Sequence, residues 1–103
     1  MISRRWLLRA SSGARVIAAL LREGLEALYS GDLPTGKAIL RDYINATIGF
    51  RRLGEAVGTP PKSLMRMLSP SGNPRADNLF AVTRHLQKQE KVRELRVRLG
   101  AGL

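Results

Sequence analysis

One short run in the middle of the chain is confined by residues that begin or interrupt helices. The run is KSLMRML, residues 62–68. A glycine and four prolines bound it: Gly58, Pro60, Pro61, Pro70 and Pro74. Proline is tolerated in the first turn of a helix, where its missing amide proton has no partner, but it interrupts a helix interior. The sequence therefore predicts a two-turn helix over residues 61–68 with both ends fixed.

The residues just before this helix predict a partner for it. Residues 50–57 have helical apolar spacing, and a glycine that permits a sharp turn follows them. Leu53 and Val57 would then face Leu64 and Met67 across the turn, which is the helix-turn-helix arrangement. A small residue is needed where the two helices cross. Gly54 stands there, although it costs about 1 kcal/mol of helix stability relative to alanine.

Three further helices are expected around this pair. Residues 14–29 are amphipathic, residues 36–48 follow a possible cap at Thr35, and residues 76–89 form the fifth helix. Residues 95–99 alternate apolar and basic side chains, which leaves a short strand or a continuation of the fifth helix open. The predicted class is all-α, a small bundle of four to five helices. One core is expected from Leu53, Val57, Leu64, Met67, Leu79, Val82 and Leu86.

The chain of 103 residues fits one small domain. We expect a basic leader over residues 1–13, a helical domain over 14–90 and a basic tail over 91–103. The leader contains SRRWLL, which resembles the start of an export signal, but arginines interrupt the apolar stretch that such a signal needs. No run approaches the roughly 18–20 apolar residues of a membrane span. The sequence therefore predicts a cytoplasmic protein without membrane contact.

The charge balance favours a polyanion as partner. The chain has 18 lysines and arginines against 8 acidic residues, a formal net charge of +10. Such an excess is typical of proteins that bind nucleic acid. Aromatic residues make up only 5% of the chain, which argues against a surface where unpaired bases stack. Nucleic acid or an anionic membrane would fit the charge, but Glu23 and Glu26 on the amphipathic helix at 14–29 oppose binding to an anionic membrane surface.

No group of residues suits catalysis, a metal or a cofactor. Cysteine is absent and His85 is the one histidine, which excludes thiolate and multi-histidine metal sites. The acidic residues on the helices have no neighbouring nucleophile or histidine base. GDLPTGK, residues 31–37, follows a helix rather than a strand, and Ala38 stands where a phosphate loop needs a hydroxyl side chain. We expect a protein that is not an enzyme and uses no cofactor.

The outward side of the short second helix carries the candidate contacts. Arginine and lysine can bind guanine in the major groove, and methionine can contact a thymine methyl group. The residues expected to contact bases are Pro61, Lys62, Ser63, Met65 and Arg66. The flanking residues expected to contact phosphates are Arg51, Arg52, Ser71, Asn73, Arg75 and Asn78. The alternative is a helical hairpin within a small bundle, with its charges merely solvated.

Most of the chain, about residues 20–95, resembles a known family. GDLPTGKAILRDYINATIGF and LGEAVGTPPKSLMRMLSPSGNPRADNLFAVTRHLQ are similar to the antidote proteins of bacterial addiction modules, the HigA-like antitoxins. LRDYINATIGF and KSLMRMLSPSGNP are the motifs that carry the resemblance. It implies a lambda-repressor-like helix-turn-helix of the XRE type that binds its own operator. It also implies inhibition of a RelE/ParE-like toxin encoded nearby, and it assigns base contact to Lys62, Ser63, Met65 and Arg66.

The expected assembly is a homodimer. One small helix-turn-helix covers too few base pairs for tight binding, so such proteins occupy two half-sites about 34–36 Å apart. We expect the contact from the tail around Leu95, Val97 and Leu99 or from the first helix, which is also our expected toxin-docking site. The second hypothesis is a protein-interaction module that neutralises a toxin without binding DNA. The salt dependence of DNA affinity separates the two hypotheses.

Overall fold

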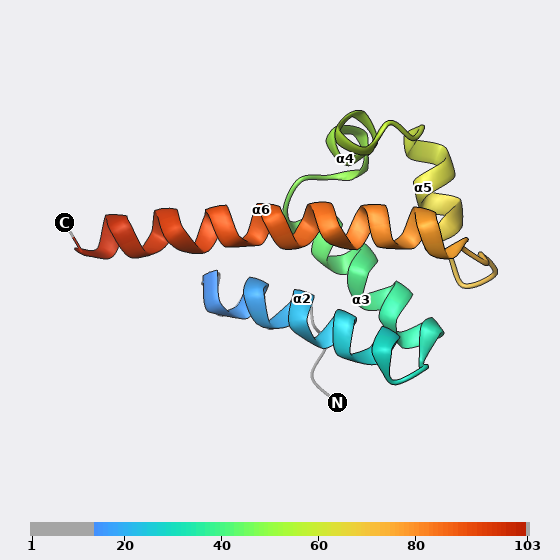
Figure 1. Ribbon diagram of the computed structural model, residues 1–103, viewed down its shortest axis with the longest axis horizontal. Coiled ribbons are helices and arrows are strands. Elements are labelled where there is room, and N and C mark those ends of the chain that lie inside the picture. Colours follow the sequence, from blue (N-terminus) through green and yellow to red (C-terminus); the bar gives the residue numbers. More distant parts are fainter. Residues whose placement is uncertain (1–13, 103) are drawn as a thin grey trace.

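Five helices make up the part of the chain that the structure describes. The computed structural model describes residues 14–102, with the backbone alone at residue 14 and residues 97–102. The helices, labelled in Figure 1, are α2 (Ala14–Tyr29), α3 (Leu33–Ala46), α4 (Phe50–Val57), α5 (Pro61–Met67) and α6 (Ala76–Gly102). Residues 14–102 contain no strand, which confirms the all-α class. The leader expected over residues 1–13 lies outside the described residues.

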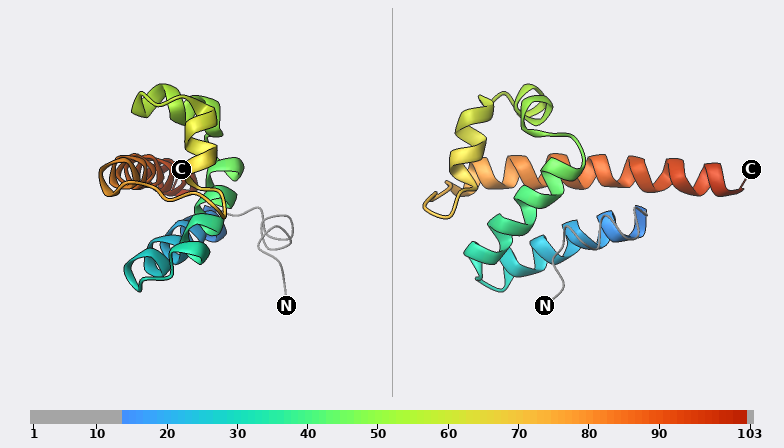
Figure 2. Two further views of the ribbon diagram at one scale, coloured as in Figure 1. Left: turned by 90° about the vertical axis from the view of Figure 1, so that its right-hand side faces the viewer. Right: turned by 180° about the vertical axis from the view of Figure 1, so that it is seen from behind.

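Helix α6 is the axis of the bundle. It has 27 residues, or about 40 Å at 1.5 Å per residue, and it sets the 43 Å long dimension. The α2–α3 hairpin packs on one side of it and the α4–α5 pair lies on the other, as the end-on view in Figure 2 shows. The C-terminal end of α6 extends past the other four helices (Figure 1).

Helix α3 begins earlier than the sequence analysis predicted. The cap is Asp32 rather than Thr35, and an Asp32 side-chain oxygen accepts a 3.3 Å hydrogen bond from the Thr35 amide. Pro34 fits within the first turn because the amide proton that it lacks would have no intrahelical partner. The helix therefore starts at Leu33. It ends at Ala46, two residues before the predicted end at residue 48.

The tail continues α6 and does not form a strand. The apolar–basic alternation at residues 95–99 was compatible with a strand, but the helix runs unbroken to Gly102. A strand needs a neighbour to satisfy its backbone, and the described residues provide none. A helix satisfies its own backbone groups. The strand alternative is therefore wrong, and the helical continuation is confirmed.

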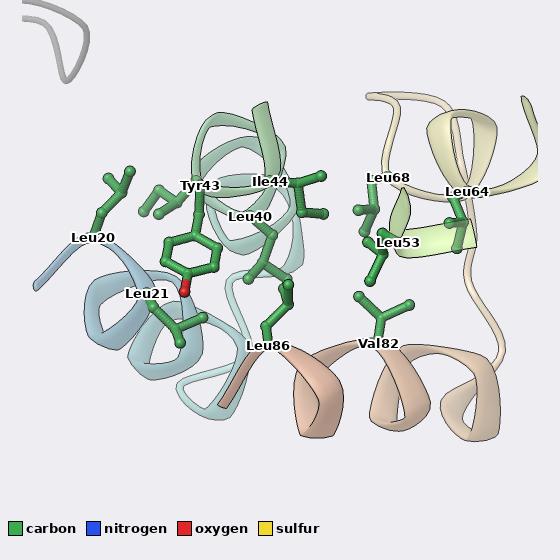
Figure 3. Packing of buried hydrophobic residues seen from close by; sticks show 11 residues of the cluster. Leu20, Leu21, Leu40, Tyr43, Ile44, Leu53, Leu64, Leu68, Val82 and Leu86 are labelled. Atoms are coloured by element: carbon green, nitrogen blue, oxygen red, sulfur yellow. The ribbon is translucent and has the colours of Figure 1, made fainter. Parts of the chain in front are cut away.

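One apolar core joins all five helices. Figure 3 shows its members, which come from α2, from α3, and from α4, α5 and α6. The buried residues are Leu20, Leu21, Ile39, Leu40, Tyr43, Ile44, Leu53, Leu64, Leu68, Val82 and Leu86. Of the seven residues predicted to share a core, Leu53, Leu64, Val82 and Leu86 are fully buried. Val57, Met67 and Leu79 are half-buried against the same cluster.

Helix α6 has the length of a membrane-spanning helix without its composition. A span needs about 20 mostly apolar residues, whereas charged side chains occur all along α6. Within residues 14–102, no helix combines the length and the apolar character needed to cross a bilayer.

Candidate nucleic-acid interface

A left-handed glycine makes the turn between α4 and α5. Gly58 has φ 74° and ψ 31°, a conformation that side chains disfavour, and its amide donates to the Gly54 carbonyl at 2.9 Å. The Thr59 amide donates to the same carbonyl at 3.0 Å. Pro60 caps α5 and Pro61 is its first residue, as the sequence predicted. This geometry confirms the helix-turn-helix arrangement of α4 and α5.

The crossing point of the two helices requires glycine. A Cβ atom at Gly54 would lie 2.5 Å from the Thr59 carbonyl oxygen and 3.3 Å from the Pro61 ring. The sequence analysis predicted that a small residue is needed here. The structure shows that even alanine would force the turn to move. Because its ring is directed at Gly54, Pro61 is half-buried and contributes to helix packing as well as to the outer surface.

A hollow of about 430 Å³ lies where α5, the loop after it and the start of α6 meet. The residues that line it are Thr59, Ser63, Arg66, Met67, Ser71, Gly72, Asn73, Pro74, Arg75 and Asn78. Two expected base-contacting residues, Ser63 and Arg66, therefore share one surface with four expected phosphate-contacting residues. The hollow thus brings together expected base-contacting residues and expected phosphate-contacting residues that are separate in the sequence.

The remaining expected base-contacting residues lie beside the hollow. Lys62 and Met65 are exposed on α5, and Met65 keeps 52% of its surface in solvent. Its neighbour Leu64 is fully buried, so the two residues lie on different sides of the helix. The outward side of α5 therefore presents positive charge, a hydroxyl group and one apolar side chain.

Two of the expected phosphate contacts lie elsewhere. Arg51 and Arg52 are exposed in the first turn of α4. Arg52 lines a different hollow, of about 390 Å³, together with Thr47, which follows α3, and with Gln89 and Arg93 of α6. The structure therefore separates Arg52 from Arg66, so any ligand that touches both must cover more than the hollow beside α5.

Two basic residues that the sequence analysis did not select hold the loop of this surface. Lys37 and Arg41, one turn apart on α3, donate hydrogen bonds to carbonyl oxygens at residues 68–72. One signal could have identified Lys37: it occupies the apolar stripe of its helix, in step with Leu40 and Ile44. A lysine in such a stripe is rarely left without acceptors.

A buried polar contact joins α3 to α6 away from this surface. The Tyr43 hydroxyl donates to Glu90 Oε1 at 2.6 Å, and Arg93 Nη1 donates to the same oxygen at 3.2 Å. Burial and the hydrogen bond to the Glu90 carboxylate raise the pKa of Tyr43 well above its usual range. In the described part of the chain, no three histidine, cysteine or acidic side chains gather where they could hold a metal ion.

Comparisons with known protein families, curated proteins and solved structures find no match to this chain. What the fold and the surface define is a small helical protein with a helix-turn-helix. Of the two motifs singled out in the sequence, LRDYINATIGF lies on the second half of α3 and the α3–α4 connection, and KSLMRMLSPSGNP lies on α5 and the following loop.

Proposed function

We propose that this protein is a cytoplasmic DNA-binding antitoxin, active as a homodimer, that represses its own operon and neutralises a RelE/ParE-like toxin. The observation that carries the DNA-binding role is the hollow beside α5. It brings Arg66 and Ser63 together with Ser71, Asn73 and Arg75. In this role the protein performs no catalysis and needs no cofactor.

The chemistry of this surface suits duplex DNA. Lys62 and Arg66 are four residues apart on α5, so both project from one side of the helix. Met65 offers an apolar contact for a thymine methyl group, while arginine can form two hydrogen bonds with guanine. Serine, asparagine and arginine side chains around the hollow are the usual donors to phosphate oxygens. The net charge of +10 would draw the protein to DNA.

Fluorescence anisotropy with two duplexes tests the DNA-binding role. One duplex carries the region upstream of the gene and the other has the same composition in scrambled order, each at two or more salt concentrations. We expect tighter binding to the upstream region and an affinity that falls steeply as salt rises, because phosphate contacts release counterions. Equal and weak binding to both duplexes would favour a protein-interaction module instead.

A second surface favours the toxin-neutralising role. A small apolar hollow of about 150 Å³ lies between α2, the start of α3 and α6. Tyr29 and Phe80 line it and remain 77% and 59% exposed. The described charged side chains of α2 balance, Arg15 and Arg22 against Glu23 and Glu26, so a basic partner would meet little repulsion there.

The toxin-neutralising role is tested with the small protein encoded beside this gene. Replacing both Tyr29 and Phe80 with serine should abolish the complex in size-exclusion chromatography, because exposed aromatic residues dominate binding energy at interfaces. The same double variant should bind the upstream duplex like the parent. The matched control, Arg66→Ala, should retain the complex. If the serine variant still binds the neighbouring protein, this hollow is not the docking site.

A further inference from the structure

The loop that follows α5 turns its carbonyl groups toward α3. Lys37 Nζ lies 2.6 Å from the Gly72 carbonyl oxygen and 3.3 Å from that of Pro70. Arg41 Nη1 donates to the Leu68 carbonyl oxygen. Two cations from one side of α3 therefore bind three carbonyl oxygens, those of the alternate residues 68, 70 and 72, at the end of α5 and in the loop.

The burial of the Lys37 side chain has a free-energy cost that its hydrogen bonds have to offset. Its side chain is among the buried residues, with 3% of the residue exposed. Moving an ammonium group out of water is unfavourable unless its protons are hydrogen-bonded. Here the acceptors are neutral carbonyl groups of a surface loop. An apolar residue in this stripe would pack against the core without any such cost, so stability alone does not account for a lysine.

Because these carbonyl groups point inward, the outer surface of the loop carries mainly hydrogen-bond donors. The Arg66 carbonyl accepts from the Ser69 hydroxyl at 2.7 Å, and the Ser69 carbonyl accepts from the Gly72 amide at 3.0 Å. Acceptors that would repel a phosphate are thus engaged within the protein. The exposed side chains of Ser71, Asn73 and Arg75 are donors.

We propose that Lys37 and Arg41 are positioning residues for the DNA-binding surface. By holding the carbonyls of residues 68–72 against α3, they keep the loop donors beside Arg66 and place positive charge behind them. The loop is then ordered before DNA arrives, so little conformational entropy is lost on binding. This inference rests on the proposed DNA-binding function and adds two residues that do not themselves touch DNA.

The test compares Lys37→Met with Lys88→Met. Methionine fills the volume of Lys37 but removes its donors and charge, and Lys88 is an exposed residue of α6 whose replacement changes the net charge equally. The first readout is amide hydrogen exchange by mass spectrometry, which should accelerate at least tenfold over residues 69–74 in Lys37→Met alone. The second is affinity for the upstream duplex, measured well below the melting temperature of each variant.

We expect Lys37→Met to lose about tenfold or more in affinity, as for a lost charge-assisted hydrogen bond, and Lys88→Met to stay within about twofold. A purely structural lysine would lower the melting temperature and leave the affinity of the folded protein unchanged. That result, or unchanged exchange in the loop, would overturn the proposal.

A second variant covers the case in which Lys37→Met does not fold. Arg41→Gln keeps a polar side chain at a half-buried site and shortens its reach, so it should also accelerate exchange over residues 69–74 and weaken DNA binding. If the parent itself fails to select the upstream duplex, the proposed function is wrong. In that case faster loop exchange in the variants would still show that Lys37 and Arg41 order the loop, without a role in DNA binding, and unchanged exchange would refute the ordering as well.

Discussion

The Tyr43 hydroxyl donates a 2.6 Å hydrogen bond to Glu90 Oε1 in the interior, and this contact joins α3 to α6. Tyr43 is fully buried and Glu90 nearly so. The contact spans 47 residues of sequence. The pair therefore adds a polar link between the α2–α3 hairpin and the axis of the bundle to the apolar core that joins them.

We predict that this pair makes stability sensitive to alkaline pH. Because burial and Glu90 raise the pKa of Tyr43, the folded protein favours the neutral phenol. Its stabilising contribution is therefore fully present below the usual tyrosine pKa of about 10 and is lost as pH rises above it. Tyr43→Phe should cost about 1–3 kcal/mol at neutral pH, with a difference from the parent that shrinks above about pH 10.

Urea unfolding followed by circular dichroism at neutral and alkaline pH measures this difference. Tyr29→Phe is the control, because Tyr29 is 77% exposed. That variant should match the parent at each pH. A gap between Tyr43→Phe and the parent that does not change with pH would contradict the prediction.

Leu64 should matter to stability far more than its neighbour Met65. Leu64 is 1% exposed and lies against the core from α5, so Leu64→Ala should cost about 2–5 kcal/mol through lost burial and a cavity. Met65→Ala, on the same helix but 52% exposed, should change the unfolding free energy by less than about 1 kcal/mol. Chemical denaturation of both variants measures the two losses of unfolding free energy. Similar losses at the two positions would mean that α5 is not packed as described.

Gly54→Ala should destabilise the protein even though alanine is the better helix former. The new Cβ would lie 2.5 Å from the Thr59 carbonyl oxygen, so the turn has to shift. We expect a loss of about 1–3 kcal/mol, as for other overpacked sites. Ala56→Gly, at an exposed position of the same helix, measures only the difference in helix propensity between alanine and glycine, about 1 kcal/mol. An increase in melting temperature for Gly54→Ala would show that the helices do not cross so closely.

Arg66 and Arg52 should affect DNA binding in different ways. Arg66 lines the hollow beside α5, so Arg66→Ala should lose about 1–3 kcal/mol and relax the preference at one or two base pairs. Arg52 lies at the separate hollow, so Arg52→Ala should weaken all sequences about equally and lower the salt slope by about 1 unit. Anisotropy with upstream and scrambled duplexes distinguishes the two. If Arg66→Ala keeps the affinity and selectivity of the parent, α5 is not the base-contacting surface.

The C-terminal part of α6 should form the dimer contact. Val92 and Leu95 are three residues apart in the C-terminal part of α6 and remain 51% and 56% exposed. Replacing both with glutamate should give a monomer in equilibrium sedimentation at micromolar concentration, with cooperative unfolding retained. The parent should sediment as a dimer, alone or with the upstream duplex. A parent that is monomeric in both conditions would refute the prediction.

Local sequence determined the helix-turn-helix. Gly58, Pro60 and Pro61 act within a few residues of themselves, through backbone conformations that each residue permits or forbids, and the spacing of Leu53 and Leu64 follows the helical period. The bounds of α2 and α4 were predictable for the same reason. No distant contact is needed to establish them.

Only the tertiary structure decided how the surface is assembled. Lys37 finds its acceptors 33 and 35 residues away, and Arg52 and Arg66 lie at different hollows although both belong to the helix pair. The alternation at residues 95–99 suited a strand, but a strand needs a partner, and a helix supplies its own hydrogen bonds. Sequence periodicity gives each helix an inward side, whereas packing alone determines which distant groups meet there.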